Sequence, residues 1–587
     1  MKPEYFVDGD SVLFNDEAAS GNITLSGELT PASVTIDNSS RAYTFTGTGS
    51  ITTGSFTKEG TGTVRMNTSN AYTGGNYLKG GTVAVSSLSN STAAYGSLGG
   101  VTTAADKFTM ENGAVLSSSY EIKNGSPMKM IGDDGGVINN VSMFSQQAAV
   151  SGTILTKKGI GTLIFSSNNS GLNRLCLMSG TVSGCANPAK TLELQAGTAY
   201  LNDGSSCTID VTGKKGVVYF NADRGTFTNK LIGSGTLTAY YVPVNYNKGA
   251  AYPSRTSIAG DFSAFEGTLV ANATAGGGFV FNNSGMPKAT LNIPNGIYVY
   301  SMNADYTLGA VTGNGALSGP GNLGGTSVAS VTWKVGNETD FTFPGKLTWT
   351  AGLNKVGTGT MTVTGAWDNT NAVKITEGSL KVSGSACLGT GALTVGTAGT
   401  LMGTNATSAG FKNSSITIDG TLQPCMNSIL GYMGNMYFNG KNVTVTDGGT
   451  LRIGVYKAST ATGAMSGSSI QNIGKLTVNG TISIWLKSGF TPAVGDVIRL
   501  WTGVTTFAGN PTIKAEGDSV EYDASHIDEG YLIVRSINST GVESVSYKDE
   551  TEATTQYYDL MGNRTSGARK GINIIRRGNK TKKVIMK

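Results

Sequence analysis

The sequence predicts an all-β protein: a long parallel β-helix, a right-handed solenoid, with a small β unit at the C-terminal end. The first observation is composition, because 84 of the 587 residues are glycine and only 13 are proline, which suits many short strands joined at corners. The second is that no stretch shows convincing helical periodicity, whereas Thr, Val, Leu and Ile alternate with small polar residues, the pattern of half-buried strands. The third is an internal repeat.

The repeat is clearest at 55–83 and returns at 154–182 and 352–380. Each copy places a lysine before a Gly-x-Gly-Thr step, and a second glycine follows that lysine by 23 residues in all three copies. Such a unit is too short to bury an apolar core alone, so units must stack on one another. A fixed spacing of this size is typical of solenoid proteins. The repeated lysines are Lys58, Lys157 and Lys355.

The domain organisation follows from where this pattern begins and ends. We expect residues 1–535 to form one β-helical rod, in which the apolar stretch at 495–501 closes the core against water, as the end of a solenoid requires. Residues 536–556 are polar and charged and are interpreted as a linker. Residues 557–587 differ in composition and are predicted to form a separate C-terminal β unit.

The repeat resembles the autotransporter-associated β-strand repeat of bacterial secreted passenger proteins. The resemblance lies in the K-x-G-x-G-T step, the later G-T-V or G-S-L step and, in the first copy, the segment Ala71-Tyr72-Thr73-Gly74-Gly75 between them. It implies a β-helical passenger that is extracellular or located at the cell surface, associated with the outer membrane.

The C-terminal end resembles the sorting domains of secreted Bacteroidetes proteins, in the segments 557–564, 570–575 and 582–587. Asn563 intervenes before Arg564, and Asn573 stands where that family usually has tyrosine. The resemblance implies recognition by a secretion machinery, export across the outer membrane and attachment to the surface.

Charge and hydropathy exclude two classes of partner. The net charge of +5 comes from residues 564–587, which hold nine Lys or Arg and no acid, so that 34 basic and 38 acidic residues give −4 for residues 1–563. We therefore expect no nucleic-acid groove along the rod. This chain starts without an apolar signal-peptide region, and it contains no apolar run long enough for a membrane-spanning segment.

The best local candidate for ligand binding is the segment 240–255, where two prolines, four tyrosines and two cations interrupt the period. A loop on a rigid scaffold is a favoured place for binding, and tyrosine with a cation can stack on sugar rings. The alternative is a corner that shields the edge of the core. The candidate residues are Tyr240, Tyr241, Tyr246, Tyr252 and Arg255.

The sequence predicts no catalytic residue, no metal site and no cofactor. The single histidine, His526, is flanked by Ser525 and Asp523, but residues adjacent on a strand point to opposite faces and cannot build a triad. Two acidic loops, at 8–10 and 133–136, lack the spacing of known calcium loops and are interpreted as solvated turns.

A β-helical polysaccharide lyase or glycoside hydrolase is the alternative function, because such enzymes need a basic residue or paired carboxylates on one face. Its candidate residues are Asp223, Arg224, Lys214, Lys215 and Arg255. The favoured function is a secreted or surface-anchored structural protein of adhesin type. Its expected partner is a polysaccharide or a host or cell-surface glycan.

Two further residue types allow two interpretations each. The repeated lysines could form a basic ladder for an acidic glycan, or each could lay its stem along the next rung as a structural corner. Cys176 and Cys185 could bridge neighbouring strands, whereas unpaired thiols packed in the core are the alternative for the five scattered cysteines.

Overall fold

The computed structural model describes residues 5–222, 225–241, 255–273, 278–320, 328–425, 433–517, 520–537, 555–577 and 580–586. Within them the chain is all-β, and its only helical segments are two 3-10 turns, Ala105–Lys107 and Thr407–Ala409. No helix in these ranges is long and apolar enough to cross a membrane. The chain divides into two compact units, Met1–Thr400 with Phe411–Ser414, and Leu401–Gly410 with Ser415–Lys587.

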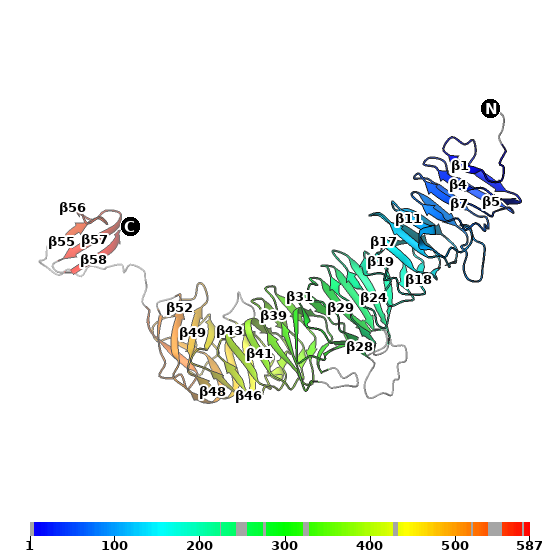
Figure 1. Cartoon of the computed structure of the whole chain (residues 1–587). Helices are drawn as coiled ribbons and strands as arrows, with labels where there is room; N and C mark the ends of the chain where they lie inside the picture. The colour runs from blue at the N-terminus through cyan, green and yellow to red at the C-terminus, as the bar shows by residue number, and fades with distance from the viewer. Residues whose placement is uncertain are drawn as a thin grey trace. The chain divides into compact units, whose positions relative to one another are not determined.

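The first unit is a parallel β-helix. Strand β1 (Ser11–Asn15) pairs in parallel with β4 (Ser33–Asp37), and β4 pairs in parallel with β7 (Ser55–Glu59). These strands lie side by side in Figure 1. Their register aligns Val12 with Val34 and Val34 with Phe56, so the two rungs are of equal length. The predicted fold class is confirmed.

Each rung contributes strands to further parallel sheets of the first unit. One extended sheet carries the strands of a tyrosine ladder and of the repeat at 352–380, and a separate sheet has six strands. The strands used below are β9 (Asn76–Leu78), β11 (Phe108–Glu111), β13 (Ile122–Asn124), β16 (Phe144–Gln146), β17 (Val150–Lys158), β18 (Thr162–Phe165), β19 (Leu172–Leu177), β22 (Thr198–Asn202), β24 (Lys215–Asn221), β27 (Thr236–Tyr241), β38 (Ala351–Lys355) and β41 (Val373–Val382). The six-stranded sheet consists of β25 (Thr226–Phe227), β28 (Arg255–Ile258), β30 (Gly278–Phe281), β32 (Tyr298–Ser301), β34 (Ala316–Pro320) and β37 (Lys346–Leu347).

Successive side chains along a strand point alternately into the coil and outward, so every second side chain is buried. In β7, Phe56 is fully buried while its neighbours Ser55 and Thr57 are half-exposed, and the same alternation holds along β22. Parallel pairing in register then stacks each buried residue on its counterpart in the next rung. The core is therefore a continuous column of Val, Leu, Ile, Phe and Met side chains.

Buried asparagines satisfy backbone groups at the corners, where the strand ladder is interrupted. The side-chain oxygen of Asn70 accepts a 3.0 Å hydrogen bond from the Ile51 amide, and that of Asn169 accepts a 2.8 Å bond from the Val150 amide. A buried backbone group without a partner is costly. The asparagine richness of the sequence thus serves the turns of the coil.

The repeated lysines are also buried, so of the two interpretations the structural corner agrees with the structure and the basic ladder for an acidic glycan does not. Lys58, Lys157 and Lys355 are each 0% exposed. Each lies at or next to the end of a strand, in β7, β17 and β38 respectively, and pairs with an apolar residue of the next rung. Because their ammonium groups lie in the corner of the coil, these three cations do not face a ligand.

Each ammonium group is held by backbone carbonyl oxygens of the repeat itself. Lys157 Nζ donates to the carbonyls of Lys158 at 2.7 Å, Gly159 at 2.8 Å and Ser179 at 3.3 Å. Lys355 repeats the arrangement with its two following residues and Glu377, and Lys58 donates to Glu59 and Gly60. Burial nevertheless lowers the pKa of all three lysines to about 8.

The cysteines are free, so the bridge considered between Cys176 and Cys185 does not form. Cys176 lies on the half-exposed face of β19, where it pairs with Glu193 of the next rung, whereas Cys185 is buried. The two thiols therefore lie in different environments. Burial raises the pKa of Cys185 to about 12 and that of Cys176 to about 11, which suppresses the reactive thiolate.

The second unit continues with parallel strands but longer rungs. Strand β47 (Thr450–Val455) pairs with β49 (Thr481–Leu486), which pairs with β52 (Thr512–Glu516). The register aligns Leu451 with Ile482 and Ile482 with Ile513, so each rung takes more chain than the rung from Val12 to Val34. A second series of successive strands also pairs in parallel: β44 (Ile416–Ile418), β46 (Asn435–Val445), β48 (Ser469–Val478) and β51 (Trp501–Ala508).

A three-stranded antiparallel sheet is formed by segments on either side of β51 and β52 in the sequence. Strand β54 (Tyr531–Ile537) pairs with β50 (Val497–Arg499) and β53 (Val520–Asp523). The predicted closing segment 495–501 lies here, and its residues Ile498, Leu500 and Trp501 are buried.

The C-terminal segment forms a small antiparallel sheet in the order β56 (Arg564–Thr565), β55 (Thr555–Tyr558), β57 (Gly571–Arg577) and β58 (Lys580–Met586). Most of the predicted linker 536–556 lies outside the described residues.

Candidate functional site

The predicted ligand-binding segment is only partly described. Tyr246 and Tyr252 lie outside the described residues, as do the side chains of Tyr241 and Arg255. Only Tyr240 can be placed, on the half-exposed face of β27. The enzyme candidates Asp223 and Arg224 also lie outside the described ranges, whereas Lys214 and Lys215 are exposed around the start of β24.

Tyr240 is the last ring of an aromatic ladder. Tyr200, Tyr219 and Tyr240 are aligned on β22, β24 and β27, with ring centroids 4.5 and 4.7 Å apart and rings tilted by 12° and 10°. Both faces of Tyr219 and one face of Tyr240 are therefore occupied by neighbouring rings. Aromatic stacks across strands stabilise sheets, and this ladder accounts for Tyr240 without a ligand.

His526 contacts Glu529 and Tyr531. Its Nδ1 lies 2.9 Å from Glu529 Oε1, and its ring stacks on Tyr531 at 4.9 Å. Asp523 instead accepts a hydrogen bond from the Ser525 amide at 2.9 Å, as in an ordinary turn. Across the described residues, no group of three or more His, Cys, Asp or Glu side chains could hold a metal ion.

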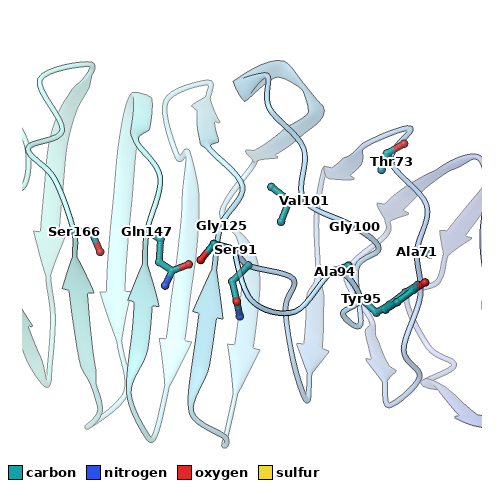
Figure 2. Close-up of a pocket in the computed structure, with 11 residues that line it drawn as sticks. Ala71, Thr73, Ser91, Ala94, Tyr95, Gly100, Val101, Gly125, Gln147 and Ser166 are labelled. Atoms are coloured by element: carbon teal, nitrogen blue, oxygen red, sulfur yellow. The ribbon is translucent and has the colours of Figure 1, made fainter.

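A groove of about 800 Å³ on the first unit is a feature that sequence reasoning missed. Figure 2 shows its labelled lining residues spread over several rungs, from Ser166 and Gln147 at one end to Ala71 and Thr73 at the other. The lining residues are Ala71, Thr73, Asn90, Ser91, Ala94, Tyr95, Gly100, Val101, Gly125, Gln147 and Ser166.

One wall of the groove is a row of equivalent positions on successive rungs. Gly125, Gln147 and Ser166 each directly follow paired strands, β13, β16 and β18. The backbone ladder continues through them, since the Gln147 amide donates to Asn124 and the Ser166 amide to Gln146, at 2.9 and 3.0 Å. The row therefore repeats with the rung spacing of a parallel sheet, about 4.8 Å.

The opposite wall comes from an insertion at 86–104. Strand β11 pairs with β9 through Met110 and Leu78, and with the following rung through Met130. The chain from Leu78 to Met110 is much longer than the chain from Met110 to Met130, and the extra residues leave the coil and return along the segment 71–73. This overlong rung is the signal from which the groove could have been suspected.

The insertion is anchored at several points, so the groove is preformed. Asn70 and Gly96 exchange two backbone hydrogen bonds of 2.9 and 3.2 Å, and the Gly100 amide donates to the Tyr72 carbonyl at 2.8 Å. Leu88 and Leu98 of the insertion are 5% and 2% exposed. A loop fixed in this way loses little conformational entropy on binding.

The groove is chemically neutral and rich in available hydrogen-bonding groups. Its lining contains no Asp, Glu, Lys, Arg or His. Tyr95, which belongs to the insertion, is 59% exposed. Within the described part of the chain, the side chains of Thr73, Ser91, Gln147 and Ser166 have no hydrogen-bond partner. Such a surface can bind hydroxyl-rich ligands and offers them no carboxylate, amine, guanidinium or imidazole group.

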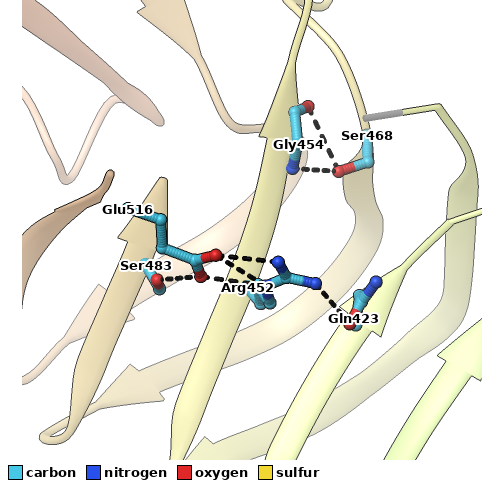
Figure 3. Close-up of polar contacts among 6 residues, drawn as sticks. All are labelled: Gln423, Arg452, Gly454, Ser468, Ser483 and Glu516. Carbon is cyan, nitrogen blue, oxygen red and sulfur yellow. Dashed lines mark hydrogen bonds and ion pairs between the residues drawn. The ribbon is translucent and has the colours of Figure 1, made fainter. Parts of the chain in front are cut away.

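A charged cluster in the second unit has its groups committed to one another (Figure 3). Arg452 donates to Glu516 from Nε at 2.8 Å and from Nη2 at 2.7 Å, and from Nη1 to the Gln423 side chain at 3.1 Å. Ser483 also donates to Glu516, and the Arg452 guanidinium lies 4.8 Å from the Trp485 ring. The hydrogen bonds from Arg452 lower the pKa of Glu516.

This cluster joins four successive rungs, since Gln423 lies on β45 (Thr421–Pro424), Arg452 on β47, Ser483 on β49 and Glu516 on β52. A carboxylate in a bidentate pair with arginine is a poor general base, because its lone pairs are occupied and its pKa is low. The cluster therefore acts as a clamp between rungs. Further along the same strand in Figure 3, the Gly454 amide donates a 2.7 Å hydrogen bond to Ser468 Oγ.

No protein-family model matches the chain, and no curated protein matches it significantly.

Proposed function

We propose that this chain is an exported, surface-associated β-helical protein of adhesin type that contacts glycans through the groove beside the 86–104 insertion and catalyses no reaction. The observation that carries the proposal is a preformed groove of about 800 Å³ whose lining has hydroxyl and amide groups and one exposed tyrosine but no ionisable acid–base pair.

The chemistry of this lining fits a neutral polysaccharide. Sugar hydroxyls both donate and accept hydrogen bonds, as do the side chains of Thr73, Ser91, Gln147 and Ser166. Tyr95 offers an amphipathic ring to the apolar face of a pyranose. The groove crosses several rungs, so a linear chain could contact successive rungs along it.

The alternative, a polysaccharide lyase or glycoside hydrolase, has no specific observation in its favour among the described residues. Those reactions need a base near the scissile bond or two carboxylates at a defined separation. Neither is found in the groove, and the Arg452–Glu516 pair is saturated by its own contacts.

Export and surface attachment remain part of the proposal. They rest on the resemblance of the repeats to those of secreted passenger proteins and of residues 557–587 to Bacteroidetes sorting domains, which would link the chain to a secretion machinery and the outer membrane. The antiparallel sheet β55–β58 gives the sorting-like segment a fold of its own, and this supports the proposal.

Affinity electrophoresis tests the binding activity. The purified chain is run through gels containing neutral polysaccharides such as galactan, xylan and mannan, and the same mixtures are assayed for new reducing ends and unsaturated products. We expect retardation by at least one neutral polysaccharide, without products. Products from any of them would overturn the non-catalytic function.

Two variants place the binding in the groove. Tyr95→Ala combined with Gln147→Ala should weaken retardation about tenfold or more, the loss typical of truncating central contacts. Tyr120→Ala is the matched control, because Tyr120 is equally exposed at 61% but does not line the groove. Equal retardation of both variants and the unmodified chain would reject the groove as the binding site.

A further inference from the structure

A second surface feature lies on the six-stranded sheet, at Trp349. This residue is 57% exposed, although three of the other tryptophans, Trp333, Trp367 and Trp501, are at most 3% exposed. Its backbone has φ +56°, and it is the one residue other than Gly and Asn with positive φ in the described ranges. A bulky side chain in this conformation is a genuine outlier.

The backbone around Trp349 is held so firmly that the unfavourable conformation persists. The Ala351 amide donates to the Thr348 carbonyl across the turn at 3.2 Å, and the Trp349 carbonyl accepts from the Thr370 amide at 2.8 Å. Thr348 Oγ1 also bonds to Ser318 Oγ at 3.1 Å. Strained residues retained by their surroundings concentrate at functional sites.

The exposed indole lies among other aromatic rings rather than alone. The ring of Tyr298 is nearly parallel to it, at a centroid distance of 6.4 Å and an angle of 20°, and Tyr300 lies 6.1 Å away. Tyr298 is on β32 and Trp349 follows β37, so the rings come from segments that are distant in sequence. Together Trp349 and Tyr298 form an aromatic platform.

A cation accompanies the platform. The Lys346 ammonium lies 5.9 Å from the centroid of the Tyr298 ring. Lys346 has no acidic partner within the described part of the chain, in contrast to Lys334, which pairs with Asp305 at 3.0 Å. A cation without an acidic partner, beside an exposed indole and a half-exposed tyrosine, is suited to a ligand with both a hydrophobic face and a negative charge.

We propose that Trp349, Tyr298 and Lys346 form a second saccharide-binding site, which takes an anionic polysaccharide containing uronic acid. A pyranose ring packs on the exposed indole, and its carboxylate pairs with the Lys346 ammonium. This inference extends the proposed glycan contact to a different ligand and a different surface, because none of the three residues lines the groove. The proposal for this site can therefore fail while the groove proposal holds, and the groove proposal can fail while this one holds.

Tryptophan fluorescence gives the first test, with oligogalacturonate as the anionic probe and the neutral galactan oligomer as its match. Trp349 is the most exposed of the five tryptophans, so a bound sugar should shift its emission to shorter wavelength and protect it from acrylamide quenching. We expect this response with oligogalacturonate only. An equal response to the neutral oligomer, or none to either, overturns the proposal.

Variants measured by titration calorimetry assign the residues. Trp349→Ala should weaken oligogalacturonate binding about tenfold or more, and Lys346→Met should weaken it and remove its salt dependence. Lys374→Met is the control, since Lys374 is an exposed lysine on β41. Unchanged affinity in the Trp349 or Lys346 variant overturns the proposal.

Trp349→Gly separates a binding role from a merely structural one. Glycine adopts the positive φ of this position without strain, so the thermal midpoint should stay the same or rise while binding is lost. If Trp349 only covered the rings beneath it, the variant would lower the midpoint and leave oligogalacturonate binding intact. That result would contradict the proposed site at Trp349. It would have no bearing on the binding measured with the groove variants.

Discussion

Lys157 Nζ lies 2.8 Å from the carbonyl oxygen of Gly159, inside the corner of its rung. The same bond joins Lys355 to Gly357 at 2.7 Å and Lys58 to Gly60 at 3.1 Å. The second glycine of the repeat completes the corner, because a Cβ on Gly180 would lie 2.8 Å from the Lys157 ammonium. The constant spacing between lysine and second glycine thus returns the chain to the same corner one rung later, and the motif encodes a buried cation with its carbonyl ligands.

Replacing a buried repeat lysine should destabilise the coil. In Lys157→Met the carbonyls of Lys158, Gly159 and Ser179 lose a donor, and unsatisfied buried groups of this kind cost about 1–3 kcal/mol each. We expect a loss of about 2–4 kcal/mol in the free energy of unfolding at pH 7. Urea denaturation followed by circular dichroism measures it.

Lys158→Met is the matched control for that measurement. Lys158 is the adjacent residue and is exposed, so its replacement should change the free energy of unfolding by less than about 0.5 kcal/mol. Equal effects of the two substitutions would show that the Lys157 ammonium contributes nothing to the corner.

Rising pH should increase the contribution of the same lysines to the stability of the first unit, whereas Cys176 and Cys185, whose pKa is raised, contribute with the opposite sign. Their folded pKa is lowered to about 8 in the case of the lysines, below that of the unfolded chain, about 10.4. Between these values each lysine binds more protons in the unfolded state, so its contribution to stability rises with pH, by up to about 1.4 kcal/mol per pH unit.

Urea denaturation at several pH values between 8 and 10 checks this sign. The slope of the free energy of unfolding against pH should be lower in Lys157→Met than in the unmodified chain by the contribution of one lysine, and unchanged in Lys158→Met. Equal slopes in Lys157→Met and the unmodified chain would contradict the lowered pKa.

Crowding at the second repeat glycine predicts a specific intolerance. Gly180 and Gly204 have similar backbone conformations, with φ of +76° and +78°. A Cβ on Gly180 would lie 2.4 Å from the carbonyl oxygens of both Gly159 and Gly161, whereas nothing lies within 4 Å of a Cβ on Gly204. Gly204→Ala should therefore cost about 1 kcal/mol of conformational strain, and Gly180→Ala markedly more. Comparable thermal midpoints for the two variants would contradict the crowded corner.

The Arg452–Glu516 clamp should make the second unit sensitive to acid. Because Arg452 lowers the pKa of Glu516, the stabilisation is complete above the unfolded pKa of about 4.3 and is lost as pH falls through the folded pKa. Glu516→Gln should cost about 1–2 kcal/mol at pH 7 and flatten the loss at acidic pH. Denaturation between pH 3 and 7 measures both effects, with the exposed Glu521→Gln as control. A variant with the same acid profile as the unmodified chain would argue against the clamp.

The fold was predictable because the relevant interactions are local or repeated. Alternation such as Phe56 between Ser55 and Thr57 identifies the buried face of a strand, and Gly60 with φ +68° marks the corner that follows. When each rung resembles the next, the pattern of one rung indicates how they all stack. Sequence reasoning for this reason identified a parallel β-helix and the repeat spacing.

The direction of the repeated lysines was not predictable in the same way. The three copies lie too far apart along the chain to form one basic patch, which favoured the structural corner. Because lysine is almost never fully buried in proteins unless it is paired, its complete burial was nevertheless not expected. Only the corner geometry shows that Lys58, Lys157 and Lys355 have carbonyl partners within reach.

The candidate sites were harder to predict, since they join segments that are distant in sequence. The groove brings Tyr95 of the insertion together with Gln147 and Ser166, and the aromatic platform pairs Tyr298 with Trp349. The tyrosines chosen from composition gave one described side chain, that of Tyr240, which belongs to the stack with Tyr219.

By itself, the sequence determined the all-β class, the parallel coil and the rung-length motif, because alternation and glycine corners act over a few residues and repeat along the chain. Only the tertiary structure decided which polar groups are buried, where the insertion leaves a groove and which tryptophan remains exposed. Those properties depend on how separate rungs pack against one another, and no local pattern specifies that packing.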